Sequence, residues 1–158
     1  MLVVVRYQKG FSLVELLIVI AIMFLIAGLS LNFFRDTALE SGLRNVGEAL
    51  KMDLELARTK AIALNQRTRI FASADTGYYA FVDANNNQAY DAEEEIFLTR
   101  DLSSYSGNIV ISSYSQPFLF KANGEGIQSR SMIFTQKSTG KSAKVSINLG
   151  QGTTITYF

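Results

Sequence analysis

The sequence contains no cysteine and no histidine among its 158 residues. Without cysteine the chain has no disulfide, no thiol nucleophile and no cysteine-based metal site. Without histidine it lacks the commonest metal ligand and the commonest general base. No other nucleophile–base arrangement and no phosphate-binding glycine loop is found in the sequence. We therefore predict that the protein is not an enzyme.

The sequence also lacks an excess of charge of either sign, and it has a single proline, Pro117. Fifteen lysine and arginine residues stand against 14 aspartate and glutamate residues, for a net charge of +1. This balance disfavours a nucleic-acid-binding protein, which usually carries a basic surface. The hydrophobic content of 48% excludes a globally disordered chain. The length fits one domain.

What the sequence does have is a long apolar segment near its start. Over residues 11–31 the only ionisable residue is Glu15, and these 21 residues span about 31 Å as a helix, close to the thickness of a bilayer's hydrocarbon core. Arg6 and Lys9 precede the segment, so the positive-inside rule keeps the N-terminus cytoplasmic. A secretory signal peptide is the alternative, but its apolar region is shorter and no A-x-A cleavage site follows. We predict a single-pass transmembrane segment over residues 11–34.

The residues at the start of this segment form a specific motif. Lys9-Gly10-Phe11-Ser12-Leu13-Val14-Glu15 followed by the apolar run resembles the class III signal of type IV pilins and type II secretion pseudopilins. The resemblance implies that a prepilin peptidase removes the leader, residues 1–10, by cutting between Gly10 and Phe11, and that it N-methylates Phe11. It also implies that Glu15 pairs with the Phe11 amine of an adjacent subunit during filament assembly. Such a pairing is physically favourable, because a lone carboxylate in lipid is destabilising by about 2.5–3.5 kcal/mol at the bilayer centre.

Apolar residues continue at helical spacing beyond the predicted membrane segment. They are Leu39, Leu43, Val46, Leu50, Leu54, Ala57, Ala61 and Leu64. We predict one helix over about residues 11–64. Its amphipathic half belongs to the segment of residues 35–65, which precedes the β-rich domain. The apolar stripe could form a coiled-coil seam, but the strands predicted after it favour a sheet as its partner.

Eight runs rich in β-branched or aromatic residues follow the predicted helix. They occupy residues 68–72, 78–83, 96–100, 108–113, 117–121, 131–136, 144–148 and 153–158. Asn123-Gly124 and the segment Ser138–Gly140 predict hairpin turns. The predicted fold class is α+β and pilin-like: a long N-terminal helix, whose first half is transmembrane, packs on a small antiparallel β-sheet domain. Residues 66–158 form the β-rich globular domain.

Two further segments narrow the resemblance. Residues 56–65 and the acidic segment 81–94 are similar to minor pilins and to the H-type pseudopilin, the GspH/FimT-like group. Asn32 stands where major pilins often carry a proline, which favours a minor subunit. The resemblance implies a structural subunit of a type IV pilus or a type II secretion pseudopilus. Its partners would be other pilin or pseudopilin subunits, the prepilin peptidase and an inner-membrane assembly platform. It would first lie in the bacterial inner membrane with its C-terminal domain in the periplasm, and then in the filament.

A DNA-uptake minor pilin that binds extracellular DNA is the alternative function, because some members of this group capture DNA. The charge argues against it: without Arg6, Lys9 and Glu15 the chain has 13 basic and 13 acidic residues. Residues 152–158, which include the last predicted strand, contain no lysine or arginine. The late lysines 137, 141 and 144 are interpreted as solvated residues of a turn and as charges that prevent another strand from pairing with an exposed strand edge. The sequence therefore disfavours nucleic acid as a partner but leaves it open.

The acidic segment also invites a metal hypothesis. Asp83, Asn85, Asn87 and Glu94 occupy positions 1, 3, 5 and 12 of a calcium-binding loop. Gln88 replaces the glycine that such a loop needs at position 6, and no flanking pair of helices is predicted. We therefore favour a polar connection with solvated acids and no cofactor, with a Ca²⁺ site at these four residues as the alternative.

Overall fold

The structure is a computed structural model that describes residues 11–148 and 152–158; the side chains of residues 29–39 are not described. The chain divides after Thr37 into two compact units. The predicted leader, with Gly10, lies outside the described residues. So do the side chains of residues 29–34, the last part of the predicted membrane segment, including Asn32.

One helix, α1 (Leu13–Leu64), confirms the long helix predicted from the sequence. It ends at Asn65, whose φ of 52° is left-handed, and the Gln66 N–H donates to the Ala61 carbonyl at 3.1 Å. Asparagine tolerates this conformation better than most residues, which explains why the helix ends here. In the second unit the predicted apolar stripe is buried from residue 43 to residue 61. At the last turn Leu64 is 43% exposed, because the helix ends there and the chain turns into the sheet.

The described part of the second unit continues as eight strands, which confirm the eight predicted runs. They are β1 (Arg67–Ser73), β2 (Gly77–Asp83), β3 (Ile96–Asp101), β4 (Ile109–Tyr114), β5 (Phe118–Phe120), β6 (Arg130–Gln136), β7 (Ser142–Asn148) and β8 (Gly152–Tyr157). A short 3-10 helix, η1 (Leu102–Ser104), follows β3. Its start is capped by Asp101, whose side chain accepts from the Ser103 N–H at 2.8 Å.

These strands form two antiparallel sheets, so the predicted antiparallel β-sheet domain is built from two layers. The strand orders are β3-β2-β1-β5 and β4-β6-β7-β8. Strand β5 returns to the first sheet, where Phe120 pairs with Thr68, while β4 begins the second sheet. The segment Ser138–Gly140 joins β6 to β7 as predicted. Asn123-Gly124 instead turns the chain back on β5, where Phe120 bridges Gly126, and joins no pair of neighbouring strands.

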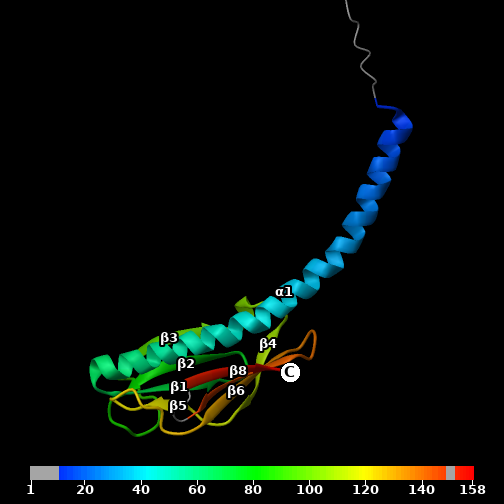
Figure 1. The fold of residues 1–158 in the computed structure, drawn as a ribbon. Coiled ribbons are helices and arrows are strands. Elements are labelled where there is room, and N and C mark those ends of the chain that lie inside the picture. The colour runs from blue at the N-terminus through cyan, green and yellow to red at the C-terminus, as the bar shows by residue number, and fades with distance from the viewer. Residues whose placement is uncertain (1–10, 149–151) are drawn as a thin grey trace, which may run out of the picture. The chain divides into compact units, whose positions relative to one another are not determined.

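The core of the second unit lies between α1 and the two sheets (Figure 1). Each layer contributes side chains that are fully buried. Examples are Leu50 and Leu54 from α1, Ile70 and Phe118 from the first sheet, and Phe134 and Val145 from the second. Burying one such side chain contributes about 1.5–3 kcal/mol to folding. The helix stripe is thus an essential layer of the β-rich domain.

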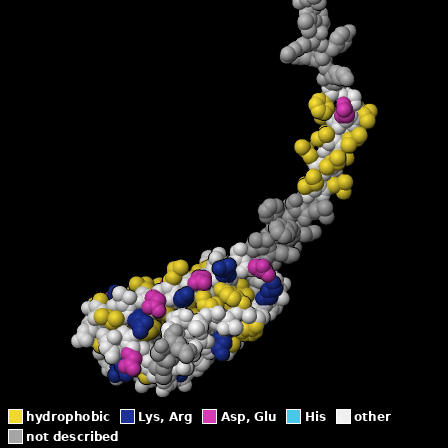
Figure 2. Space-filling view, in the orientation of Figure 1, with side chains coloured by type: hydrophobic (Ala, Val, Ile, Leu, Met, Phe, Trp, Pro, Cys, Tyr) yellow, Lys and Arg dark blue, Asp and Glu magenta, His cyan; other side chains and the backbone are white. Residues whose placement is uncertain are grey.

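The described part of the first unit has no comparable core. All of its large apolar side chains between Phe11 and Ile26 are at least 41% exposed (Figure 2). They surround α1 on all sides, because the sequence has no polar face here. Among the residues described, no helical stretch is both long and apolar enough to count as a membrane span.

Candidate assembly site

The first turn of α1 holds the predicted assembly residue Glu15. The Ser12 backbone N–H donates to Glu15 Oε2 at 3.0 Å, and the Glu15 N–H donates to Ser12 Oγ at 3.2 Å. This reciprocal arrangement is a capping box, which satisfies two N–H groups that a helix start otherwise leaves without partners. The negative charge also lies at the positive end of the helix dipole. The Ser-x-x-Glu spacing is the sequence signal for this cap, and our prediction for Glu15 did not include it.

The cap leaves part of the Glu15 carboxylate available. Within the described residues its second oxygen, Oε1, has no hydrogen-bond partner. Phe11, the predicted new N-terminus, lies just before the cap with its side chain 83% exposed. The first turn therefore presents one carboxylate oxygen and a large apolar side chain to whatever surrounds it.

A polar cluster anchors the second half of α1 to the first sheet; its members Asp53 and Tyr78 are buried, and Arg100 is partly exposed. Asp53 Oδ2 accepts from the Tyr78 hydroxyl at 2.7 Å and from Arg100 Nε at 2.8 Å, and Oδ1 accepts from Arg100 Nη2 at 2.9 Å. Burial, and then the charge of Asp53, raises the pKa of Tyr78 well above its usual range, so its hydroxyl stays a donor. The hydrogen bond to Asp53 raises the pKa of Arg100. Sequence reasoning missed Asp53, because its partner Arg100 is 47 residues away and a helix carboxylate is normally solvated.

The structure separates the four predicted calcium ligands into two groups. Asp83 is buried, and its Oδ2 accepts from Arg69 Nε, while its Oδ1 has no partner among the described residues. Asn85 and Asn87 instead both donate to Asp91 Oδ2, at 2.7 and 2.6 Å. Since a guanidinium beside Asp83 opposes a cation there, this geometry does not favour a shared metal.

Glu94, the fourth predicted ligand, holds the backbone of the same loop. Its Oε1 accepts from the Ala84 N–H at 3.0 Å and its Oε2 from the Asp91 N–H at 3.2 Å. The part of the chain that the structure describes contains no cluster of three or more acidic residues placed to hold a metal ion. Ca²⁺ binding by the loop stays a prediction that only an experiment tests.

The three late lysines have different surroundings. Lys137 lies in the turn after β6. Lys141 forms an ion pair with Glu40 of α1, and the hydrogen bond from Lys141 lowers the pKa of Glu40. Lys144 lies on β7, an interior strand of the second sheet. The prediction that Lys144 guards a sheet edge was therefore wrong, because β8 pairs outside β7.

Comparisons with known proteins agree with this arrangement. Residues 46–151 match the family described as Type II transport protein GspH, and residues 5–31 match the Prokaryotic N-terminal methylation motif. The pilin-like protein PilA1 of Thermus thermophilus is 33% identical over 94 residues, which cover 58% of this chain and 59% of that protein. The chain thus spans less than two thirds of the length of this relative.

A solved structure has a similar fold. The crystal structure of the type IV minor pilin FimU from Pseudomonas aeruginosa matches with a TM-score of 0.58 at 19% identity, over 74% of this chain and 90% of that one. This likeness confirms the pilin-like α+β fold. The methylation motif includes Gly10, Phe11 and Glu15, and the GspH match covers more than half of the chain. The chain therefore belongs to the GspH family of type II transport proteins, as a structural, non-enzymatic pseudopilin or minor pilin subunit with a prepilin methylation motif.

Proposed function

We propose that the protein is cut between Gly10 and Phe11, N-methylated at Phe11, and then assembled through α1 into a type IV pilus or a type II secretion pseudopilus. The observation that carries this proposal is the exposure of every large apolar side chain from Phe11 to Ile26. Such a continuous apolar surface is unfavourable in water, by roughly 25 cal/mol per Å². A membrane before assembly and a bundle of like helices after assembly both remove it from water.

The same proposal gives the protein an orientation. Residues 11–34 cross the inner membrane, with Arg6 and Lys9 of the precursor on the cytoplasmic side. The amphipathic half of the helix, residues 35–65, and the globular domain, residues 66–158, lie in the periplasm. The inner-membrane assembly platform then moves the helix from lipid into the filament core. Because the helix exchanges one apolar environment for another, little hydrophobic energy is lost.

Glu15 has two roles in this proposal. Its Oε2 caps its own helix by accepting from the Ser12 N–H. Its Oε1 forms an ion pair with the Phe11 amine of a neighbouring subunit. An ion pair in an apolar bundle is stable only when both charges have partners, so this contact also sets the register between helices. The Asp83–Glu95 loop is proposed to act as a polar connection without metal. Titration with calcium to millimolar concentration is expected to leave the melting temperature unchanged, and a clear rise would support the alternative.

The processing step is tested by deleting the prepilin peptidase of the producing cell. Intact-mass measurement should then find the chain about ten residues longer and without the N-terminal methyl group. The same mass in both strains would overturn the assignment of Gly10 and Phe11.

The assembly step is tested with Glu15→Gln and Glu15→Ala. Glutamine still fits the capping box but carries no charge, whereas alanine loses both the cap and the charge. We expect both variants to be processed and held in the membrane, and both to be depleted from filaments by about tenfold or more, since one lost pairing of ~1.4 kcal/mol is tenfold in equilibrium. Normal incorporation of Glu15→Gln would show that the charge is not required.

A further inference from the structure

The two sheets of the second unit have four edge strands, β3 and β5 in the first sheet and β4 and β8 in the second. A sheet edge exposes unpaired N–H and C=O groups, so proteins usually blunt it with charge, proline, a bulge or a cover. Strand β3 contains Arg100 and Asp101, and its pairing with β2 has a register shift. It is therefore protected by both charge and irregularity.

Strands β4 and β5 are also protected. Strand β5 has three residues, directly follows Pro117, and is bridged at Phe120 by Gly126. The pairing of β4 with β6 shifts register between Ile111 and Ser113. The Ile111 N–H donates at 2.9 Å to the Asp75 carbonyl in the turn between β1 and β2. Three of the four edges thus carry an identifiable device against strand addition.

Strand β8 has none of these devices. Its sequence, GTTITY, contains no charged residue and no proline. Its register with β7 is continuous over six residue pairs, from Asn148↔Gly152 to Ala143↔Tyr157, so it has no bulge. It is long enough and regular enough to accept another strand along its whole length.

The hydrogen-bond pattern shows which backbone groups of β8 point outward. Ser142 and Phe158 exchange both backbone bonds, at 2.8 and 2.9 Å. In an antiparallel pair bonded and non-bonded residue pairs alternate, so the N–H groups of Thr153, Ile155 and Tyr157 face away from β7. None of these three N–H groups has an acceptor among residues 11–148 and 152–158. They form a row of free donors, accompanied by their own carbonyl acceptors.

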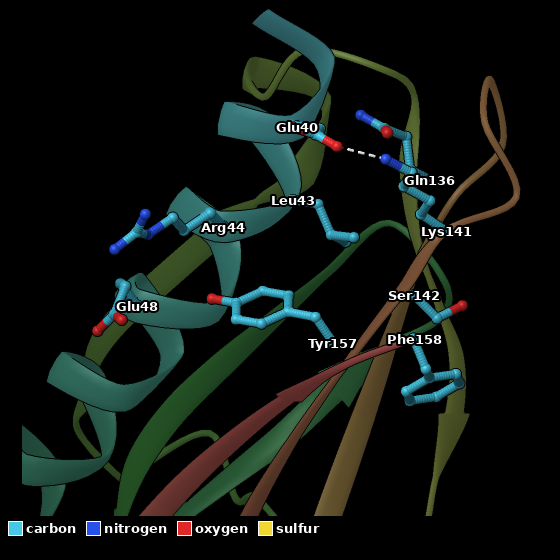
Figure 3. A pocket seen from close by; sticks show the side chains of 9 residues that line it. All are labelled: Glu40, Leu43, Arg44, Glu48, Gln136, Lys141, Ser142, Tyr157 and Phe158. Atoms are coloured by element: carbon cyan, nitrogen blue, oxygen red, sulfur yellow. Dashed lines mark hydrogen bonds and ion pairs between the residues drawn. The ribbon is translucent and has the colours of Figure 1, made fainter. Parts of the chain in front are cut away.

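A groove adjoins this edge, between α1 and the C-terminal end of β8. Its volume is about 500 Å³. Figure 3 shows the side chains that line it. Residues of α1 line one side of the groove, and Leu43 is the apolar one among Glu40, Leu43, Arg44 and Glu48. The rest of its lining is Gln136, Lys141, Ser142, Tyr157 and Phe158. Figure 3 shows the Tyr157 ring pointing toward α1. A strand added to β8 would place alternate side chains beside this groove, because side chains alternate between the two faces of a sheet.

We propose that β8 accepts an extended strand from a neighbouring, different pilin-family subunit, which continues the second sheet and places an apolar side chain in the groove between α1 and Tyr157. The proposal rests on the proposed function, because it assumes assembly beside other subunits. The free backbone groups can pair with an extended segment of another chain. Because β8 carries no charged side chain, it offers no ionic contact to a charged polymer such as a nucleic acid. Antiparallel pairing of β8 with a second copy's β8 would point the two α1 helices in opposite directions. Assembly through α1 requires one direction, which excludes this antiparallel pairing of two copies and favours a different subunit as the partner.

The test compares Ile155→Pro with Ile155→Ala in the full chain. Both variants lose the Ile155 side chain, which lies near Gly47 of α1, but only proline removes the outward N–H. Because that N–H is not bonded to β7, the ladder within the sheet remains. We expect both variants to be processed and membrane-bound, and Ile155→Pro to be at least about tenfold less abundant in filaments than Ile155→Ala, a difference of ~1.4 kcal/mol. Equal incorporation of the two variants would overturn the proposal.

A second pair of variants and a crosslinking experiment complete the test. If Ile155→Pro does not fold, Tyr157→Pro against Tyr157→Ala repeats the comparison at the exposed end of β8. A photo-crosslinking residue at Thr156 should give a product that contains an extended segment of another pilin-family subunit, and Tyr157→Pro should abolish it. A crosslinked homodimer, or a product unaffected by Tyr157→Pro, would overturn it. Failure of Glu15→Gln to reduce incorporation would instead count against the proposed role of α1.

Discussion

The two halves of α1 show how one helix serves two environments. Between Phe11 and Ile26 the large apolar side chains surround the helix and are all exposed. Between Leu43 and Ala61 the apolar side chains form one stripe, and the two sheets bury it. Figure 2 shows apolar side chains on the first half and a mixed charged surface on the second unit. The second half thus packs within its own chain, whereas the proposed function gives the first half its partners outside the chain.

The carboxylates of Glu15 and Asp53 also differ between the two halves of α1. In the first half the one carboxylate, Glu15, lies at the helix start and keeps one oxygen without a partner among the described residues. In the second half the carboxylate of Asp53 is fully used by Tyr78 and Arg100. The paired carboxylate of Asp53 stabilises its own domain, whereas the free oxygen of Glu15 is the one that we propose accepts the amine of a neighbouring subunit.

The largest effect that distinguishes the halves is expected from paired leucine substitutions. Leu54→Ala should lower the free energy of unfolding by about 2–5 kcal/mol, because Leu54 is fully buried. Leu17→Ala should change it by no more than about 0.5 kcal/mol, because Leu17 is 58% exposed in the isolated chain. Urea unfolding of the full chain in detergent measures both values. Equal effects of the two substitutions would contradict the difference in packing between the two halves of α1.

A smaller effect is expected from the Asp53, Tyr78 and Arg100 cluster. Asp53→Ala should destabilise the second unit by about 1–3 kcal/mol, since it leaves the buried Tyr78 hydroxyl without its acceptor. The ion pair adds little beyond this, because the Arg100 side chain is 40% exposed. Asp53→Asn is the matched control, since its amide oxygen still accepts one hydrogen bond and should retain part of the stability. If both variants unfold at the same urea concentration as the unchanged protein, the cluster does not anchor the helix.

The smallest effect is expected from the exposed pair Glu40–Lys141 at the start of the second half. The hydrogen bond from Lys141 lowers the pKa of Glu40 below its ordinary value of 4.5. The pair therefore contributes stability above pH 4.5, and this contribution is lost as the pH falls through the lowered, folded-state pKa. The melting temperature of Glu40→Gln should be slightly below that of the unchanged protein at neutral pH, and the difference should close in acid. A difference that grows in acid would contradict this sign.

The regular elements could be predicted from the sequence because their signals are local. The stripe from Leu43 to Ala61 has helical spacing, and the eight strand runs are separated by turn residues. The division into two sheets could not be predicted, because the pairing of β5 with β1 joins segments about 50 residues apart without any local signal. The buried role of Asp53 depends on the same long-range placement.

The candidate site was predictable to a different degree at each residue. Phe11 and Glu15 follow from a motif with fixed spacing, which the family comparison also contains. The capping contact between Ser12 and Glu15 was available from the Ser-x-x-Glu spacing but competed with the resemblance-based role of Glu15. The unprotected edge at β8 could not be predicted, since the strand that ends the sheet is known only once the strand order is known.

The most direct test of the difference between the two halves uses the absence of cysteine from the chain. Ile22→Cys and Met52→Cys each place one thiol on an exposed position, at side chains that are 50% and 67% exposed in the structure. A membrane-impermeant maleimide, applied to the membrane-bound chain and then to assembled filaments, should label Met52→Cys in both samples and Ile22→Cys in neither, while detergent-dissociated protein should be labelled at both. Equal labelling of the two thiols in membranes and filaments would contradict the account.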